Sequence, residues 1–137
     1  MSQLREECGV FGFYGSETCN VADFAYYGLY ALQHRGQESC GIVVNDSGVF
    51  SSYKDLGIVN DVFTPQRLKN LGKGNMVVGH VRYATTGSNE RGNAQPIVVN
   101  HIKGRMALAH NGNITNSFEL RSELELQGSI FHTTSDT

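Results

Sequence analysis

The sequence has few cysteines and little net charge, and each shortage excludes a class of protein. Its 137 residues include three cysteines, which is an odd number, and no CxxC pair. This argues against a disulfide framework and against a structural zinc site. The net charge of −2 gives no electrostatic reason to bind nucleic acid or an anionic membrane. We therefore expect no metal in this chain, and neither nucleic acid nor membrane as a partner.

Long apolar segments are also absent. The apolar runs are far shorter than the roughly 20 residues that span a bilayer, and residues 1–7 (MSQLREE) lack the apolar core of a secretory signal. The length suits one domain, and 39% hydrophobic with 18% charged residues is typical of a soluble globular chain. We expect a protein of the cytoplasm.

Alternating and continuous apolar runs predict strands, two pairs of which form hairpins. The expected strands cover 8–14, 40–44, 49–53, 76–84, 97–102 and 105–109, and another begins at 130–132. Hairpins imply antiparallel pairing. Because the chain stops a few residues into the last expected strand, we expect a truncated domain.

Three helices complete the predicted elements and make the fold class α+β. Asn20 is a candidate cap for a helix whose apolar stripe includes Phe24 and ends near Gly36. Thr64-Pro65 starts a short helix, since proline is favoured in the first turn. Asn116 caps a third helix, which runs to about residue 127. Residues 85–95 form a polar loop.

Cys8 follows seven polar residues and begins an apolar strand. One interpretation is a small buried core residue, because free cysteine is often buried. The other is a nucleophile exposed at a new amino terminus by removal of residues 1–7. The α-amine has a pKa of about 7.7–8.0 and the thiol one of about 8.5, so one residue would supply both nucleophile and base.

Three further positions complete a possible amide-hydrolysing site, each with a structural alternative. Asn111 and Gly112 follow a strand as a turn would, or donate to an oxyanion. Arg82 ends an apolar strand, where it forms a structural ion pair or a bidentate clamp on an α-carboxylate. Asp136 lies among hydroxyl residues as a turn residue, or binds an α-ammonium group.

Five motifs in order along the whole chain resemble class II glutamine amidotransferases, which are N-terminal-nucleophile hydrolases. They are CGVFG at 8–12, RGQES at 35–39 with Gly41-Ile42 after it, HVRYAT at 80–85, HNGNI at 110–114 and TSD at 134–136. The resemblance implies an αββα sandwich with antiparallel sheets, incomplete in this chain. It implies a propeptide at 1–7 and the amino-terminal part of the glutaminase domain at 8–137.

The same resemblance implies a role for each site residue. Cys8 would be the nucleophile that releases ammonia from glutamine, with Asn111 and Gly112 as the oxyanion hole. Arg82 would bind the substrate carboxylate and Asp136 its α-amine, and Thr85 would line the same pocket. His80 and His110 are interpreted as hydrogen-bonded residues that support the motifs, since no spacing suggests a metal site.

Within the family, LQHRGQES at 32–39, YATTGS at 83–88 and NAQP at 93–96 resemble the branch that begins purine synthesis from phosphoribosyl pyrophosphate. That branch implies a second, phosphoribosyltransferase domain, absent from this chain, with Mg²⁺ and in some members a 4Fe–4S cluster. It also implies a homo-oligomer for the intact enzyme. This fragment alone is expected to expose an unpaired sheet edge and apolar surface.

Other functions stay open on the sequence alone. The chain could be the glutaminase part of a hexosamine-forming enzyme or of a glutamate synthase. With residues 1–7 uncut, the amine of Cys8 is blocked, and the chain would bind glutamine without hydrolysing it. A redox domain using Cys19 or Cys40 is the weakest alternative, because there is no CxxC pair.

Overall fold

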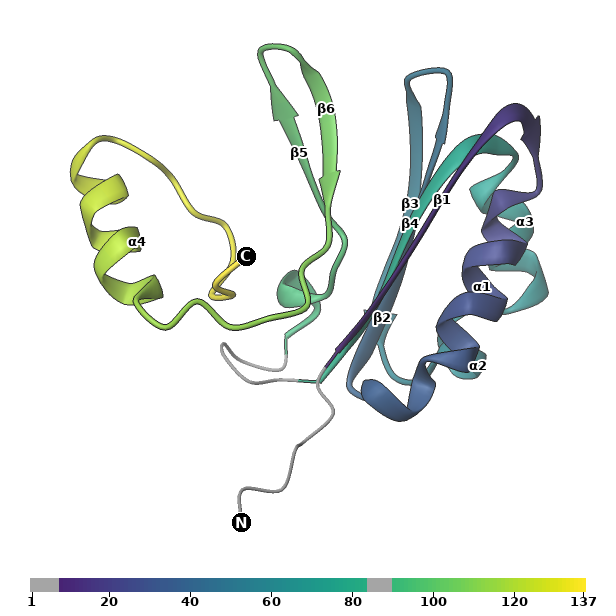
Figure 1. Ribbon diagram of the computed structural model, residues 1–137, viewed down its shortest axis with the longest axis horizontal. Coiled ribbons are helices and arrows are strands. Elements are labelled where there is room, and N and C mark those ends of the chain that lie inside the picture. The colour runs from purple at the N-terminus through teal and green to yellow at the C-terminus, as the bar shows by residue number, and fades with distance from the viewer. Residues whose placement is uncertain (1–7, 84–89) are drawn as a thin grey trace.

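A four-stranded antiparallel sheet forms the centre of the fold in the computed structural model, which describes residues 8–83 and 90–137. The strand order is β1-β4-β2-β3 (Figure 1). The bounds are β1 Gly9–Cys19, β2 Ser39–Asp46, β3 Val49–Leu56 and β4 Gly74–Arg82. The predicted hairpin at 40–53 is confirmed as β2–β3, and its turn places Ser47 and Gly48 at positive φ.

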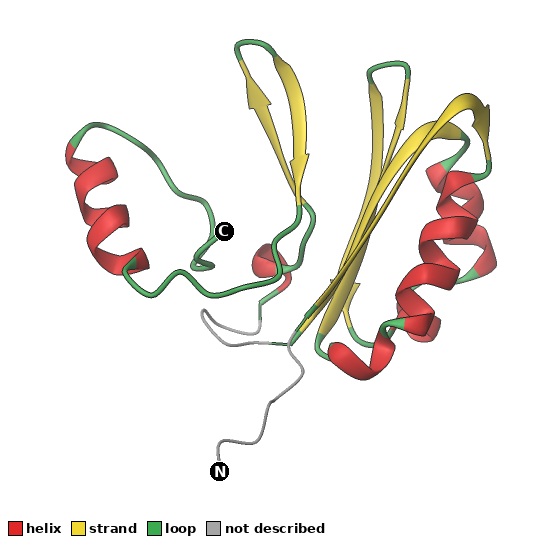
Figure 2. Cartoon of the chain, viewed as in Figure 1, coloured by secondary structure: helices red, strands yellow, loops and turns green. Residues whose placement is uncertain are grey.

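Three helices cover one face of this sheet (Figures 1 and 2). They are α1 Val21–Ala31, α2 Val59–Val62 and α3 Pro65–Leu71. The predicted cap at Thr64 is confirmed, since its hydroxyl accepts a hydrogen bond from the Arg67 amide at 3.3 Å. Asn20 precedes α1 as expected, but its side chain makes no capping hydrogen bond.

The core lies between α1 and the sheet. Val21, Ala25 and Leu29 of the predicted stripe are buried against strand residues such as Ile42 and Val77. The prediction was wrong for Phe24, which is 46% exposed and makes an edge-to-face contact with Phe13 at a centroid distance of 5.1 Å. A Cβ on Gly28 would lie 2.2 Å from the Phe11 ring, so the absence of a side chain there lets α1 approach β1.

The second part of the chain lies on the other face of the sheet (Figure 1). The predicted hairpin is confirmed as β5 Ile97–His101 and β6 Gly104–Leu108, which pair only with each other. Beyond it lies α4 Ser117–Leu126, so Figure 2 shows helix, sheet, hairpin and helix in succession. Asn116 precedes α4 without a side-chain capping bond.

The predicted strand at 130–132 is wrong, because the described chain has bends and no strand after α4. Here the chain folds back on α4. The Arg121 guanidinium lies 4.7 Å from the centre of the Phe131 ring and donates to the Thr133 carbonyl at 2.7 Å. Within residues 8–83 and 90–137, every helix is too short or too polar to cross a bilayer.

Apolar surface is exposed throughout the second part, as predicted for an incomplete sandwich. None of the residues of α4 is buried. The most exposed apolar side chains here include Ile102, Phe118, Leu126 and Ile130. This hairpin and helix therefore do not form a closed hydrophobic core with the residues that the structure describes.

Candidate active site

Cys8 lies at the head of β1, where the backbone holds it in an unusual conformation. Its φ is 52°, a value uncommon for a residue other than glycine, and it is only 7% exposed. The thiol lies 3.4 Å from both the amide nitrogen and the carbonyl oxygen of Tyr83. Arg35 fixes the residue from the other side, because its Nε donates to the Cys8 carbonyl at 2.8 Å. The thiol is thus placed against the end of β4, one residue beyond Arg82.

Arg82 is the last residue of β4 and is buried. A guanidinium Nη1 lies 3.9 Å from an Oε2 of Glu38, so the ion pair that we considered from the sequence is present. The Glu38 amide also donates to the Arg82 carbonyl at 3.1 Å. A guanidinium has five donors, so a long contact to one carboxylate is compatible with binding a second.

The loop after β6 carries Asn111 and Gly112, which are both exposed. The preceding residue ties this loop to the sheet. His80 Nε2 lies 3.1 Å from the His110 carbonyl oxygen, and the His110 amide donates to Gln95 Oε1 at 2.7 Å. Two donors positioned by a fixed backbone can stabilise a developing oxyanion.

Asp136 meets the far end of the same loop. Its Oδ2 accepts a hydrogen bond from the Ile114 amide at 2.7 Å, and the Ser135 hydroxyl lies 3.4 Å from its Oδ1. The structure therefore joins the segment of Asp136 to the loop of Asn111 and Gly112. The carboxylate therefore binds a backbone amide that lies 22 residues earlier in the chain. A residue of a local turn would contact only its near neighbours.

His80 is completely buried in β4, and its Nδ1 has no hydrogen-bond partner among the residues that the structure describes. Burial lowers the pKa of the imidazole to about 4, although the hydrogen bond to His110 opposes the shift. The ring is neutral near pH 7. Since a carbonyl only accepts, Nε2 must carry the proton. This confirms the interpretation of His80 as a hydrogen-bonded residue of its motif.

The remaining cysteines offer little chemistry. Cys40 is buried in β2, and burial together with the charge of Asp55 raises the pKa of its thiol to about 12. A thiol in that state is a poor nucleophile, since the thiolate is the reactive form. Cys19 is half-buried and, like Cys40 and Cys8, is not in a disulfide.

Sequence reasoning did not find three residues that hold this site together. Arg35 contacts Cys8. The buried side chain of Asn93 contacts Thr134, and that of Gln95 contacts Thr137 and His110. The motifs RGQES and NAQP contained the signal, but an arginine or an amide in a turn does not reveal its partner. Thr85, predicted to line the pocket, lies outside the described residues.

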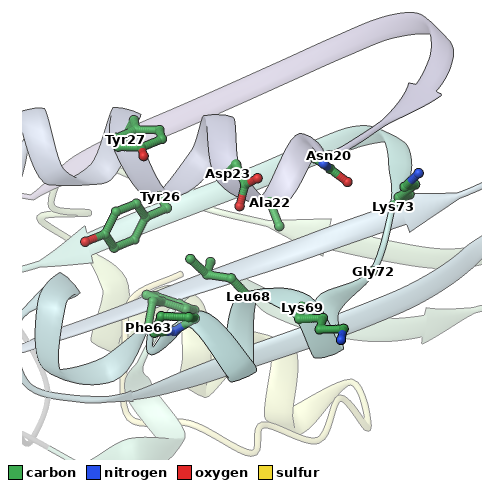
Figure 3. A pocket seen from close by; sticks show the side chains of 11 residues that line it. Asn20, Ala22, Asp23, Tyr26, Tyr27, Phe63, Leu68, Lys69, Gly72 and Lys73 are labelled. Carbon is green, nitrogen blue, oxygen red and sulfur yellow. The ribbon is translucent and has the colours of Figure 1, made fainter.

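Cavities adjoin both α1 and α4. One of about 530 Å³ lies between α1 and α3 and contains none of the predicted site residues (Figure 3). Another of about 370 Å³ lies between α4 and the end of the chain and is lined by Ile114 and Asp136. Across residues 8–83 and 90–137, no three His, Cys, Asp or Glu side chains come together as metal ligands.

The fold and the motifs define a class of protein. The glutamine amidotransferase domain family matches residues 64–137, and this chain belongs to that family. Its relatives include amidophosphoribosyltransferases. The one of Methanocaldococcus jannaschii is 51% identical over 130 residues, which are 95% of this chain and 27% of that protein. The one of Bacillus subtilis is 47% identical over 135 residues, which are 98% of this chain and 28% of that protein.

Solved structures agree with these relatives. A structure described as the allosteric regulatory enzyme of purine biosynthesis has a TM-score of 0.84 and 46% identity, and it covers 93% of this chain and 27% of its own. The glutamine phosphoribosylpyrophosphate amidotransferase of B. subtilis, complexed with ADP and GMP, has a TM-score of 0.81 and 45% identity over the same shares. The α+β fold with antiparallel sheets is thereby confirmed. The chain spans about 27% of the length of these proteins.

Proposed function

We propose that this chain is the glutaminase part of an amidophosphoribosyltransferase and hydrolyses glutamine to glutamate and ammonia. The observation that carries the proposal is the position of the Cys8 thiol, 3.4 Å from the Tyr83 backbone at the end of the strand that carries Arg82. The identity of about half to amidophosphoribosyltransferases supports the choice of branch.

The nucleophile requires removal of residues 1–7, whose structure lies outside the described residues. The freed α-amine of Cys8 takes the thiol proton, directly or through a water, and the thiolate attacks the amide carbon of glutamine. The amide nitrogen then leaves as ammonia after receiving a proton, and a thioester remains on Cys8. Water attacks the thioester and releases glutamate.

The other residues bind charge. Asn111 Nδ2 and the Gly112 amide donate to the oxygen that becomes negative in each tetrahedral intermediate. Arg82 binds the α-carboxylate and Asp136 the α-ammonium group of the substrate, with Thr85 in the same pocket. The hydrogen bond from the Ile114 amide to Asp136 supports this arrangement, because it places the carboxylate at the loop of the oxyanion donors.

In the intact enzyme the ammonia reacts with phosphoribosyl pyrophosphate to give 5-phosphoribosylamine, the first step of purine nucleotide synthesis. We propose a cytoplasmic homo-oligomer. Mg²⁺, and in some members of this branch a 4Fe–4S cluster, would belong to the phosphoribosyltransferase domain.

The intact mass of the purified protein tests the proposal, before and after incubation with a diazo-ketone analogue of glutamine. We expect loss of residues 1–7 and one adduct, located at Cys8, which Cys8→Ala abolishes. Cys19→Ala is the matched control and should keep the adduct. If residues 1–7 remain attached and no adduct forms, the chain as made would bind glutamine at most and would not hydrolyse it. Formation of 5-phosphoribosylamine from phosphoribosyl pyrophosphate would separate this branch from the hexosamine-forming one.

A further inference from the structure

We propose that Asn93 and Gln95 are positioning residues of the glutamine site, and that Gln95 affects both kcat and KM whereas Asn93 affects KM alone. The proposal rests on the proposed glutaminase function. The two residues belong to NAQP at 93–96, which the sequence marked only as a feature of one branch. In the structure both residues are buried, and their side-chain amides are hydrogen-bonded to Thr134, Thr137 and His110.

Gln95 holds two parts of the site at once. Its side chain is 3% exposed. Oε1 accepts from the His110 amide at 2.7 Å, which fixes the residue next to Asn111. Nε2 donates to the Thr137 hydroxyl at 3.1 Å, which fixes the residue next to Asp136. One buried amide thus sets the separation between the oxyanion donors and the group that binds the substrate amine.

In the hydrogen bonds given by the described residues, Asn93 holds the segment of Asp136. It is 1% exposed, and its Nδ2 donates to the Thr134 hydroxyl at 2.7 Å while its Oδ1 accepts from the Thr134 amide at 2.9 Å. Thr134 lies two residues before Asp136. The Asn93 amide thus bonds to Thr134 through both its nitrogen and its oxygen. These two bonds fix the position of the segment that carries Asp136.

The segment that carries both amides is itself fixed to the sheet. A Cβ on Gly41 of β2 would lie 2.2 Å from the Gln95 carbonyl oxygen, so the backbone of 95 rests directly on the strand. From β3, Lys54 Nζ donates to the Ala94 carbonyl at 2.6 Å. Because this segment is held against the sheet, the hydrogen bonds of Asn93 and Gln95 fix the loops of the site relative to the sheet.

The kinetic consequences differ for the two residues. Loss of an interaction made equally in the ground and transition states raises KM, whereas loss of oxyanion stabilisation lowers kcat. Gln95→Met removes both hydrogen bonds and keeps a side chain of similar volume. We expect its kcat to fall by about 10- to 100-fold, which is at most near the effect of deleting an oxyanion donor. We also expect its KM to rise. Asn93→Leu should raise KM about tenfold and leave kcat within about twofold.

The test measures glutaminase kinetics of the full-length gene product with Cys8 as its first residue. Gln66→Met is the matched control, since Gln66 is an exposed amide on α3 that contacts only Asn70, at 2.9 Å, in the described hydrogen bonds. It should match the parent protein. Gln95→Glu keeps an oxygen that faces the His110 amide and another for the Thr137 hydroxyl. It should retain more kcat than Gln95→Met.

Each outcome decides the matter. If the parent protein hydrolyses glutamine and Gln95→Met has unchanged kcat and KM, this inference is wrong while the proposed function stands. If Gln95→Met fails to fold, the comparison of Gln95→Glu with Asn93→Leu decides, and equal effects of both on kcat and KM would indicate a merely structural role. A parent protein that neither hydrolyses glutamine nor is labelled at Cys8 would overturn the proposed function, and this inference with it.

Discussion

At the scale of single residues, three side chains of the predicted site already have partners within the chain. The Cys8 thiol contacts the Tyr83 backbone, Arg82 lies near Glu38, and Asp136 accepts from the Ile114 amide. Such contacts hold a site in position before the substrate arrives, which reduces the entropy lost on binding. They also mean that a structural and a catalytic effect must be separated by matched variants.

Arg82 illustrates how this separation is made. Removing a charge-assisted hydrogen bond to the substrate costs about 1.5–3 kcal/mol, so we expect Arg82→Gln to raise KM for glutamine by about 10- to 100-fold. Glu38→Gln removes the charge of the internal partner and should change KM less than about threefold. Steady-state glutaminase assays of both variants make the comparison. Equal increases in KM would mean that the ion pair, and not a substrate contact, explains the burial of Arg82.

At the scale of elements, the site depends on a close crossing between the turn after α1 and the end of β4. A Cβ on Gly36 would lie 2.7 Å from the carbonyl carbon of Val81 and 2.8 Å from backbone atoms of Arg82. Backbone atoms cannot rotate away as a side chain can. The absence of a side chain at Gly36 therefore brings Arg35 close enough to reach the Cys8 carbonyl.

The crossing predicts different effects for two glycine substitutions. Gly36→Ala should destabilise the fold by about 1–3 kcal/mol, the usual effect of overpacking, and should weaken labelling of Cys8 by the diazo-ketone analogue. Gly12→Ala in β1 is the control, because a Cβ there has no atom within 4 Å. Thermal unfolding and the extent of labelling are measured for each. A Gly36→Ala protein as stable and as reactive as Gly12→Ala would show that the strands adjust around the added methyl group.

At the scale of the whole molecule, the two faces of the central sheet are covered unequally. The helices α1, α2 and α3 bury a continuous core on one face, whereas α4 buries none of its residues. Contiguous exposed apolar surface favours association, and a hairpin alone is marginally stable in water. The buried hydrogen bonds of Asn93 and Gln95 tie Thr134, Thr137 and His110 of this second part together.

For the 137-residue chain made alone, we predict self-association. Size-exclusion chromatography with light scattering should give a mass above the 15.0 kDa of one chain, because burial of apolar side chains stabilises contacts between copies. The double variant Phe118→Lys with Leu126→Lys, at two highly exposed positions of α4, should shift the mass toward the monomer. A monodisperse monomer of the unsubstituted chain would contradict this prediction.

The sequence by itself determined most of the local elements, although it did not predict α2 and it placed at 130–132 a strand that the described chain lacks. Period-2 and helical apolar patterns, together with proline and glycine at the ends, were sufficient for the two hairpins, the helices α1, α3 and α4, and the α+β class. These signals depend on residues that are close together along the chain. They can therefore be recognised without knowing which residues contact one another in the fold. Five ordered motifs also indicated the family, which the match at 64–137 bears out.

Only the tertiary structure decided how these pieces meet. It placed Phe24 at the surface, folded 130–132 back onto α4 instead of extending it as a strand, and left the side chains of Asn20 and Asn116 out of capping bonds. It also gave Arg35, Asn93 and Gln95 their partners. The physical reason is that burial and hydrogen bonding of a side chain depend on atoms far away along the chain, 42 residues for Gln95 and Thr137 and 75 residues for Cys8 and Tyr83, and local sequence carries no record of them.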